Sequence, residues 1–326
     1  MQKVVQDVVQ EVVQQGRLKV VILGTGGTIA GTAAQAGDTI GYTAGQVGVA
    51  ALVAAVPMLA GEALESEQVA QLDSKDMTHA VWLALAQRVE AHLARPEVAG
   101  VVITHGTDTL EETAYFLHRV VDASRKPVVL CAAMRPATAL SADGPQNLLD
   151  AVQLARTEGA AGVMAVLAGS VHAAADVRKV HPYRADAFSS GDAGVVAHIE
   201  AGRVRRHRPW PEAAGSGSRR LRADPELWPR VEIVTSHAGA RGTLVAALQA
   251  AGVDGIVVAA TGNGSLHHEL EAALVAAQQA GVRVLRSTRC LDGAVLDAGT
   301  EVLSSAGALT PVKARIALLL DLMTGG

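Results

Sequence analysis

The sequence predicts an α/β protein, with a doubly wound, mostly parallel sheet in a large N-terminal domain and a second, smaller α/β domain at the C-terminus. Two observations carry this prediction. From Leu18 onward, short apolar runs alternate with helical patterns, as in parallel strands joined by helical crossovers. Aromatic residues make up only 2% of a chain that is 49% hydrophobic, so the core is expected to consist mainly of Ala, Val, Leu and Ile.

In the N-terminal domain, strands are expected where continuous apolar runs are bounded by glycine, proline or polar residues. Four runs meet this description: Val20–Leu23, Val101–Thr104, Val128–Leu130 and Val163–Leu167. Helices fit between them. Apolar residues recur every four positions from Met77 to Leu93, Thr109 and Glu112 form a capping box that opens the next helix, and Pro145 suits the first turn of a third.

The alternation lapses beyond Arg203, where an arginine-rich stretch precedes glycine and serine residues without periodicity. We interpret this stretch as a solvated interdomain linker. The pattern then resumes with strands at Val231–Val234, Ile256–Ala259 and Val282–Leu285, and with helices from Thr243, His267 and Val312. The predicted division is an N-terminal extension at residues 1–16, an N-terminal domain at 17–205, a linker at 206–230 and a C-terminal domain at 231–326.

The composition excludes several classes of function. A net charge of −4 and a pI near 6.3 give no global attraction to nucleic acid or to an anionic membrane, so a small-molecule partner is expected. No run of about 18 apolar residues is available to span a membrane. Cys131 and Cys290 are too few and too far apart for a disulfide framework or a zinc site, and we expect two buried free thiols.

Residues 1–16 repeat a Val-Val-Gln pattern that has neither the cationic start nor the continuous apolar region of a secretion signal. The expected location is therefore the cytoplasm, or the periplasm if a signal has been removed or replaced. The extension itself receives no function.

Ligands of open parallel sheets bind at the carboxyl ends of the strands, so the loops that follow the strands are the places to look for chemistry. The first loop is Gly24-Thr-Gly-Gly-Thr-Ile-Ala-Gly31. A dinucleotide fingerprint fails because Ile29 stands in place of its third glycine, and a phosphate loop fails because no Gly-Lys-Ser/Thr occurs. Two interpretations remain: a hydroxyl nucleophile beside backbone oxyanion donors, or an ordinary strand-to-helix turn.

A second loop, His105-Gly-Thr-Asp-Thr-Leu-Glu-Glu-Thr113, places hydroxyls and a carboxylate at another strand end, and Asp108 is suited to holding a substrate ammonium. Either loop alone is weak evidence because Thr and Asp are common helix caps, but the two together are strong. The histidines lack metal-ligand spacing and no serine elbow occurs, so we expect no metal and assign surface or structural roles to His105, His237, His267 and His268.

The two loops resemble the signatures of the bacterial L-asparaginase and glutaminase-asparaginase family, at Thr25–Gly31 and His105–Leu117. Further segments are similar to the family, in family order: Gly41–Gly48, Ala133–Pro136, Ser141–Pro145 with Asn147, Asp176–Lys179 and Gly262–Gly264. The resemblance covers nearly everything from Leu18 to the C-terminal helix. It implies the two-domain fold predicted above and hydrolysis of L-asparagine to L-aspartate and ammonia through an acyl-threonine intermediate, without metal or cofactor.

The resemblance also implies five catalytic residues. Thr28 matches the nucleophile, and Tyr42 matches the tyrosine of a mobile lid, whose phenol would assist proton removal. Thr107, Asp108 and Lys179 match a second threonine, an aspartate and a lysine that together shift the pKa of a hydroxyl. Without the resemblance, Tyr42 would be a packing aromatic and Lys179 a solvated lysine.

For substrate binding, Gly27 and Gly106 allow close approach of the backbone, and Asp108 is joined by Ser74, which matches the serine that holds the α-carboxylate. Lys75 falls where the family has an uncharged amide, and it either touches the substrate or turns outward. Ser265 falls at an asparagine that the neighbouring subunit contributes in the family. A contributed acidic residue is either Asp292, Asp297 or neither.

The family builds homotetramers from intimate dimers, so the prediction is a homotetrameric L-asparaginase. One alternative is a glutaminase-asparaginase with the same mechanism, because one extra methylene changes binding by only about 1–3 kcal/mol in a fitted pocket. The other is a non-catalytic amino-acid-binding protein that keeps the fold, since a fold alone does not establish an activity.

Overall fold

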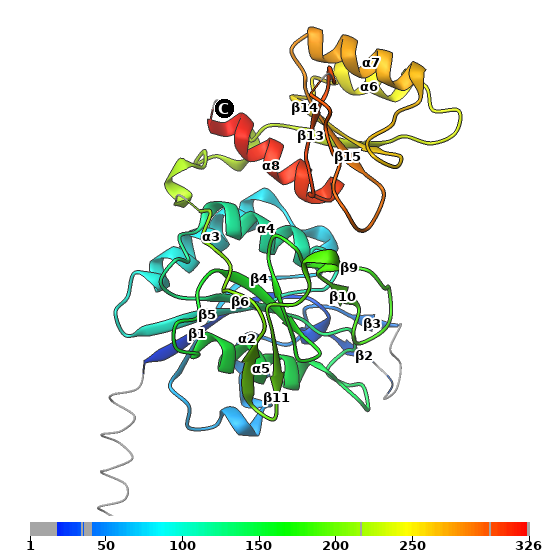
Figure 1. The fold of residues 1–326 in the computed structure, drawn as a ribbon. Helices are drawn as coiled ribbons and strands as arrows, with labels where there is room; N and C mark the ends of the chain where they lie inside the picture. Colours follow the sequence, from blue (N-terminus) through cyan, green and yellow to red (C-terminus); the bar gives the residue numbers. More distant parts are fainter. Residues whose placement is uncertain (1–17, 34, 36–40, 216, 300, 325–326) are drawn as a thin grey trace, which may run out of the picture. The chain divides into compact units, whose positions relative to one another are not determined.

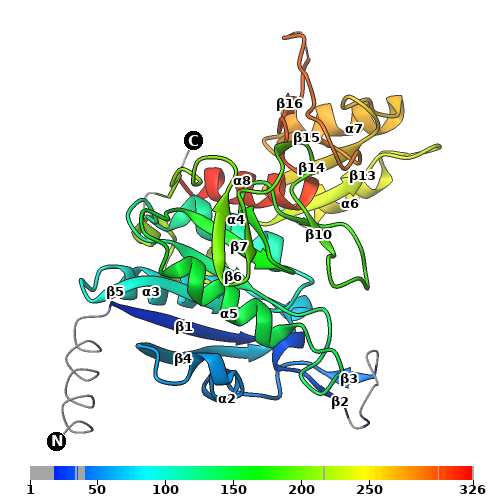
Figure 2. The ribbon, with the colours of Figure 1, turned by 60° about the horizontal axis from the view of Figure 1, so that its bottom comes forward.

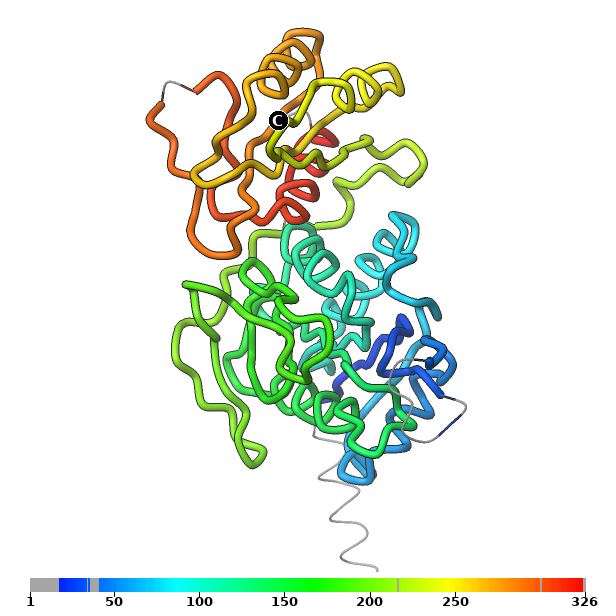
Figure 3. The backbone as a smooth tube through the Cα atoms, turned by 90° about the vertical axis from the view of Figure 1, so that its right-hand side faces the viewer, coloured from blue at the N-terminus to red at the C-terminus, as the bar shows by residue number. Residues whose placement is uncertain are grey.

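The computed structural model describes residues 18–33, 35, 41–215, 217–299 and 301–324, so the extension expected at residues 1–16 lies outside the described residues. The chain separates into two compact units, Met1–Ser218 and Arg219–Gly326. Figure 3 traces the backbone of the two units in chain order, from blue near the N-terminus to red at the C-terminus. The division between them falls inside the stretch predicted as a linker, and each unit is described by itself.

The first unit is built on an eight-stranded sheet in the order β12-β11-β8-β7-β6-β5-β1-β4. Five neighbouring strands are parallel: β4 (Leu64–Leu72), β1 (Lys19–Gly26), β5 (Val98–Thr104), β6 (Val128–Cys131) and β7 (Val163–Leu167). Three antiparallel strands extend the β7 side: β8 (Ser170–Ala173), β11 (Ala197–Glu200) and β12 (Arg203–Arg206). The four predicted strands are confirmed.

Helices cover both faces of this sheet, which confirms the doubly wound arrangement. Figure 1 shows α3 (His79–Leu93) and α4 (Leu110–Val120) on one face, and α2 (Val49–Ala54) and α5 (Gly144–Ala155) on the other. The central strands are buried on both sides, and their Val, Ile and Leu side chains make up most of the core. The few aromatics include Trp82 and Phe116, which are buried and stack on each other where α3 meets α4. Pro145 lies in the first turn of α5, as predicted.

Two short ribbons carry candidate catalytic residues. The first pairs β2 (Thr32–Ala33) with β3 (Tyr42–Thr43), and the second pairs β9 (Arg178–Lys179) with β10 (Phe188–Ser189). Figure 2 shows β2, β3 and β10 on the side toward which β1 runs. The ribbons therefore lie toward the carboxyl ends of the parallel strands, where an open α/β sheet binds its ligands.

The second unit is a smaller parallel sheet, also as predicted. Its strands are β13 (Val231–Thr235), β14 (Gly255–Ala260), β15 (Arg283–Thr288) and β16 (Ser304–Ser305), in that order. Figure 1 shows α6 (Thr243–Ala250) and α7 (His268–Gln279) on one face and α8 (Pro311–Thr324) on the other. The predicted helix starts at Thr243, His267 and Val312 are confirmed within one residue.

Three expectations from the sequence are wrong. The Thr109 hydroxyl does not cap α4 but donates to the Ser74 carbonyl, because a neighbouring loop offers an acceptor. The arginine-rich stretch from Arg203 begins as the edge strand β12, whose Arg205 pairs with Glu200 across the hairpin. Cys131 is a buried free thiol, but Cys290 is exposed because it lies in the loop after β15.

Among the described residues, no helix is both long enough and apolar enough to cross a membrane.

Candidate active site

The end of β1 and the loop that follows it are held between the two neighbouring strands. On one side the Thr25 hydroxyl donates to the carbonyl of Thr104 at 2.9 Å, and on the other the Gly27 N–H donates to the carbonyl of Leu72 at 2.8 Å. Gly26 and Gly27 have φ angles of 103° and 81°, which glycine adopts without the Cβ penalty that other residues incur. The sequence therefore needs glycine at both positions for the loop to turn here.

Thr28 begins a short 3₁₀ turn, Thr28–Ala30, and its side chain meets Tyr42 from the β2–β3 ribbon. The two hydroxyl oxygens are 2.7 Å apart, so one hydroxyl donates to the other. Thr28 is only 7% exposed. A nearly buried hydroxyl with a phenol in hydrogen-bond range is an arrangement that favours proton removal from the threonine.

The loop after β5 brings a second group together around Lys179. The Lys179 ammonium donates to the Thr107 hydroxyl oxygen at 2.9 Å and to a carboxylate oxygen of Asp108 at 2.7 Å. The Lys179 side chain is 18% exposed, whereas that of Asp108 is 54% exposed. Asp108 thus keeps a solvent-facing oxygen that can accept from a ligand, while the lysine is largely withdrawn from water.

The two loops touch through their glycines. A Cβ on Gly27 would overlap the Cα and N of Gly106 and lie 2.8 Å from the His105 carbonyl carbon. A Cβ on Gly106 would lie 2.7 Å from the Cβ of Ser74. Ser74, which follows β4, accepts at its hydroxyl from the Asp108 N–H at 3.2 Å. Loops after three adjacent strands therefore meet at one point.

Lys75 and Ser265 are placed differently from this group. The Lys75 side chain is 60% exposed and pairs with Asp76 and Asp73, and its hydrogen bond to Asp76 raises the pKa of the ammonium. Its charge thus turns outward, which is one of the two expected outcomes.

Ser265 belongs to the second unit, where it is exposed and exchanges backbone hydrogen bonds with Thr261, so it is not among the residues that the first unit gathers.

His105 is structural rather than a metal ligand or a base. It is fully buried, its Nδ1–H donates to the Gly106 carbonyl at 2.7 Å, and burial lowers the pKa of the imidazole to about 4. The ring is therefore neutral near pH 7.

Elsewhere among the described residues, His267, His268 and Glu269 place one ligand atom each within 4.8 Å of the others. They sit at the amino end of α7, where the helix dipole disfavours a cation.

Several supporting residues received no role from the sequence. The Glu111 carboxylate accepts from the Lys179 N–H at 3.3 Å and so ties β9 to α4. Asp143 accepts from the backbone N–H groups of Met134 and Arg135 at 2.9 and 3.0 Å, which shapes the loop after β6. These residues fall inside segments that resemble the family, and that position is the one signal that points to them.

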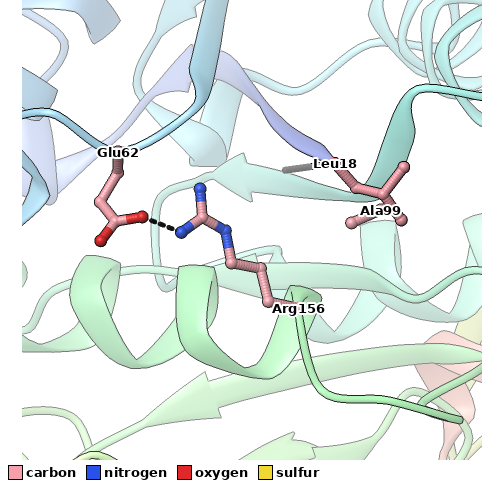
Figure 4. Close-up of a pocket in the computed structure, with 4 residues that line it drawn as sticks. All are labelled: Leu18, Glu62, Ala99 and Arg156. Atoms are coloured by element: carbon pink, nitrogen blue, oxygen red, sulfur yellow. Dashed lines mark hydrogen bonds and ion pairs between the residues drawn. The ribbon is translucent and has the colours of Figure 1, made fainter. Parts of the chain in front are cut away.

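A hollow of about 360 Å³ lies at the amino ends of β1 and β5, the opposite strand ends from the catalytic loops. Figure 4 shows its lining residues, in which Glu62 forms an ion pair with Arg156 while Leu18 and Ala99 supply apolar surface. Its lining contains no nucleophile or unpaired carboxylate, so we do not place chemistry there.

The fold and these contacts define a class: a two-unit α/β protein with a threonine–tyrosine pair and a threonine–lysine–aspartate cluster beyond the carboxyl ends of a parallel sheet. Comparison with known families names it more closely. The N-terminal asparaginase model matches residues 19–212, and the glutaminase/asparaginase C-terminal model matches residues 230–325. The chain therefore belongs to the asparaginase family.

Individual relatives agree with this assignment. The chain is 40% identical over 311 residues to L-asparaginase 2 of Escherichia coli K12, covering 93% of this chain and 88% of the relative. It is 37% identical to the glutaminase-asparaginase of Pseudomonas fluorescens, covering 93% and 86%. The crystal structure of a probable cytoplasmic L-asparaginase from Campylobacter jejuni superposes with a TM-score of 0.88 at 38% identity, covering 94% and 95% of the two chains.

Proposed function

We propose that this protein hydrolyses L-asparagine to L-aspartate and ammonia through an ester on Thr28. The observation that carries the proposal is the 2.7 Å contact between the Thr28 and Tyr42 hydroxyls beside the Lys179 cluster. Membership of a family whose relatives are named L-asparaginase or glutaminase-asparaginase supports the substrate class. The groups that act in this scheme are all protein side chains and backbone N–H groups.

In this mechanism the Tyr42 oxygen accepts the proton of Thr28 and gives up its own phenolic proton toward the leaving amide nitrogen, as the threonine oxygen attacks the side-chain amide carbon. Backbone N–H groups of the two glycine-containing loops stabilise the oxyanion, which is the purpose we assign to the close approach of Gly27 and Gly106. The amide nitrogen takes up this phenolic proton and leaves as ammonia. Water then cleaves the ester to release aspartate. The covalent intermediate splits one difficult hydrolysis into two easier reactions.

We assign the second cluster to proton transfer and substrate orientation. The Lys179 ammonium donates to the Thr107 oxygen, which lowers the pKa of that hydroxyl and makes it a better proton donor to the leaving amine. The exposed oxygen of Asp108 accepts from the substrate ammonium. Ser74, which adjoins Asp108 through its backbone hydrogen bond, is our proposed donor to the substrate α-carboxylate.

The test is a comparison of Thr28→Ala with the parent protein in an ammonia-release assay. We expect the variant to lose at least about 1,000-fold in kcat, because the nucleophile is removed, while it still binds L-aspartate in calorimetry. Mass spectrometry of the parent, quenched during turnover, should show an adduct on the peptide that contains Thr28. Full activity of Thr28→Ala would contradict the assignment, and tight aspartate binding by a parent protein without turnover would favour the non-catalytic alternative.

A glutaminase-asparaginase is the second candidate because three relatives carry that name. Parallel measurement of kcat/KM on L-asparagine and L-glutamine separates the two. A ratio near unity identifies the glutaminase-asparaginase, and a large excess for asparagine identifies an asparaginase with a pocket fitted to the shorter side chain.

We further propose a homotetramer of intimate dimers in the cytoplasm, with Ser265 completing the neighbouring site. The Campylobacter jejuni relative, a probable cytoplasmic L-asparaginase, supports the compartment. Asp297 is paired with Arg286, so it is the weaker choice for a contributed acid. Light scattering of the purified protein tests the assembly, and cell fractionation tests the compartment. Ser265→Ala, assayed on the intact oligomer, should raise KM.

A further inference from the structure

The ribbon that carries Tyr42 is short in the part of the chain that the structure describes. There it consists of two residue pairs, Thr32 with Thr43 and Ala33 with Tyr42. An isolated two-stranded hairpin is at best marginally stable in water, and two pairs are fewer than a hairpin usually has. Contacts from outside the ribbon therefore decide whether the Tyr42 hydroxyl stays 2.7 Å from Thr28.

The loop after β6 supplies such contacts along the outer side of β2. The Ala33 N–H donates to the Thr138 hydroxyl oxygen at 3.0 Å, and one residue earlier in the loop the Ala137 N–H donates to the Gly31 carbonyl at 3.0 Å. Ala33 is the residue that pairs with Tyr42. Thr138 is therefore two contacts away from the phenol that meets the nucleophile.

This loop is itself firmly held. Asp143 accepts from two backbone N–H groups in it, those of Met134 and Arg135, and the Arg135 guanidinium donates to the Ser141 side chain at 2.8 Å. Asn147 on α5 donates to the Ala132 carbonyl at 2.8 Å, where the loop leaves β6. Because this loop is anchored, its hydrogen bonds to β2 can fix the position of the ribbon, which the two residue pairs alone do not fix.

On the other strand of the ribbon, the chain after Tyr42 is fastened to the body of the unit. The Gly45 N–H donates to the Gly27 carbonyl at 3.0 Å, and the Gly45 carbonyl accepts from the Gln71 amide at 2.6 Å. These bonds hold β3 from the β4 side, whereas Thr138 is the side chain that holds β2.

We propose that Thr138 is a positioning residue for the reaction, whose hydroxyl fastens Ala33 and thereby keeps Tyr42 against Thr28. The inference rests on the proposed function, because it gives Thr138 a role only through Tyr42. Thr138 itself does not contact the substrate. Its side chain is exposed, so a single substitution changes this bond without opening a cavity in the core.

The experiment is a double-mutant cycle in kcat/KM for ammonia release from L-asparagine. Thr138→Val keeps the shape of the side chain and removes the acceptor, and we expect it to lower kcat/KM by about threefold to tenfold, the range of one net hydrogen bond. Thr138→Ser should restore the activity. Thr157→Val is the matched control, because the Thr157 hydroxyl bonds to the Gln153 carbonyl at the end of α5, far from the ribbon in the sequence, and it should leave kcat/KM unchanged.

The deciding measurement is Thr138→Val in a Tyr42→Phe background. If Thr138 acts through the phenol, its loss costs nothing further once the hydroxyl of Tyr42 is gone. An equal loss in both backgrounds, or no loss in the parent, would overturn the inference while leaving the proposed function intact. Full activity of Tyr42→Phe alone would overturn both the role of Thr138 and the role assigned to Tyr42.

Discussion

The contact between Gly27 and Gly106 can be tested by adding a single methyl group. In Gly27→Ala the new Cβ would lie 2.8 Å from the His105 carbonyl carbon and still nearer to two backbone atoms of Gly106, whereas ordinary contact begins at 3.4 Å. Both obstacles are backbone, so no side chain can rotate away. The two catalytic loops must separate by roughly 1 Å to admit the methyl group.

Two costs follow from this separation. The φ of 81° and ψ of −172° at residue 27 define a conformation adopted almost only by glycine, and it costs an alanine about 1–3 kcal/mol of folding free energy. Misplacing catalytic groups by about 1 Å costs on the order of 100-fold in rate. We therefore expect Gly27→Ala to lower kcat/KM for asparagine by about 100-fold or more.

Gly159→Ala separates the two effects. Gly159 has a φ of 70°, and no heavy atom lies within 4 Å of the position that a Cβ would take there, so this substitution adds backbone strain without a clash. It should lower the free energy of unfolding, measured with urea, by about 1–2 kcal/mol and leave kcat/KM unchanged. If Gly27→Ala behaved like Gly159→Ala in both measurements, the contact between the loops would have no part in the reaction.

Further predictions concern the second cluster, His105 and the second unit. Lys179→Met removes the hydrogen bonds that the ammonium donates to Thr107 and Asp108, and it should lower kcat by about 100-fold to 10,000-fold. The circular dichroism spectrum should not change, and a kcat near the parental value would contradict the role of Lys179. Burial lowers the pKa of His105 to about 4, so between about pH 6.5 and pH 4 the imidazole is protonated in the unfolded chain but not in the folded one. The free energy of unfolding therefore falls as the pH drops through this range, by up to about 3 kcal/mol. Urea unfolding at pH 5 and pH 7 should show that difference shrink in His105→Gln, and equal pH dependence in the two proteins would exclude the linkage. Asp297→Asn leaves Arg286 without its carboxylate and should destabilise the second unit by about 1–2 kcal/mol in thermal unfolding, a value reduced because Asp297 is partly exposed; an unchanged Tm would contradict this.

Much of the fold follows from local pattern. The strands at Val101–Thr104, Val128–Leu130 and Val163–Leu167 were predictable because a strand buried on both faces needs a continuous apolar run. The edge strand β4 was not predicted, because Leu64–Leu72 has four consecutive polar residues, at positions 65–68, and so shows neither an apolar run nor a regular alternation. Strands β11 and β12 were missed for a similar reason, since a charged hairpin at the sheet edge has no apolar run to mark it.

The candidate site divides in the same way. By itself the sequence determined which residue types follow the first and second catalytic strands, and its resemblance to a family indicated Thr28, Tyr42, Thr107, Asp108 and Lys179. Only the tertiary structure brought Lys179, from a ribbon 71 residues after Asp108, to 2.7 Å from its carboxylate. It also turned the charge of Lys75 outward and brought Thr138, from the loop after β6, within hydrogen-bond distance of Ala33, which pairs with Tyr42. The reason is physical: strand pattern and loop chemistry depend on neighbours in the chain, whereas hydrogen-bond partners depend on which strands lie side by side and how closely their glycines let them approach.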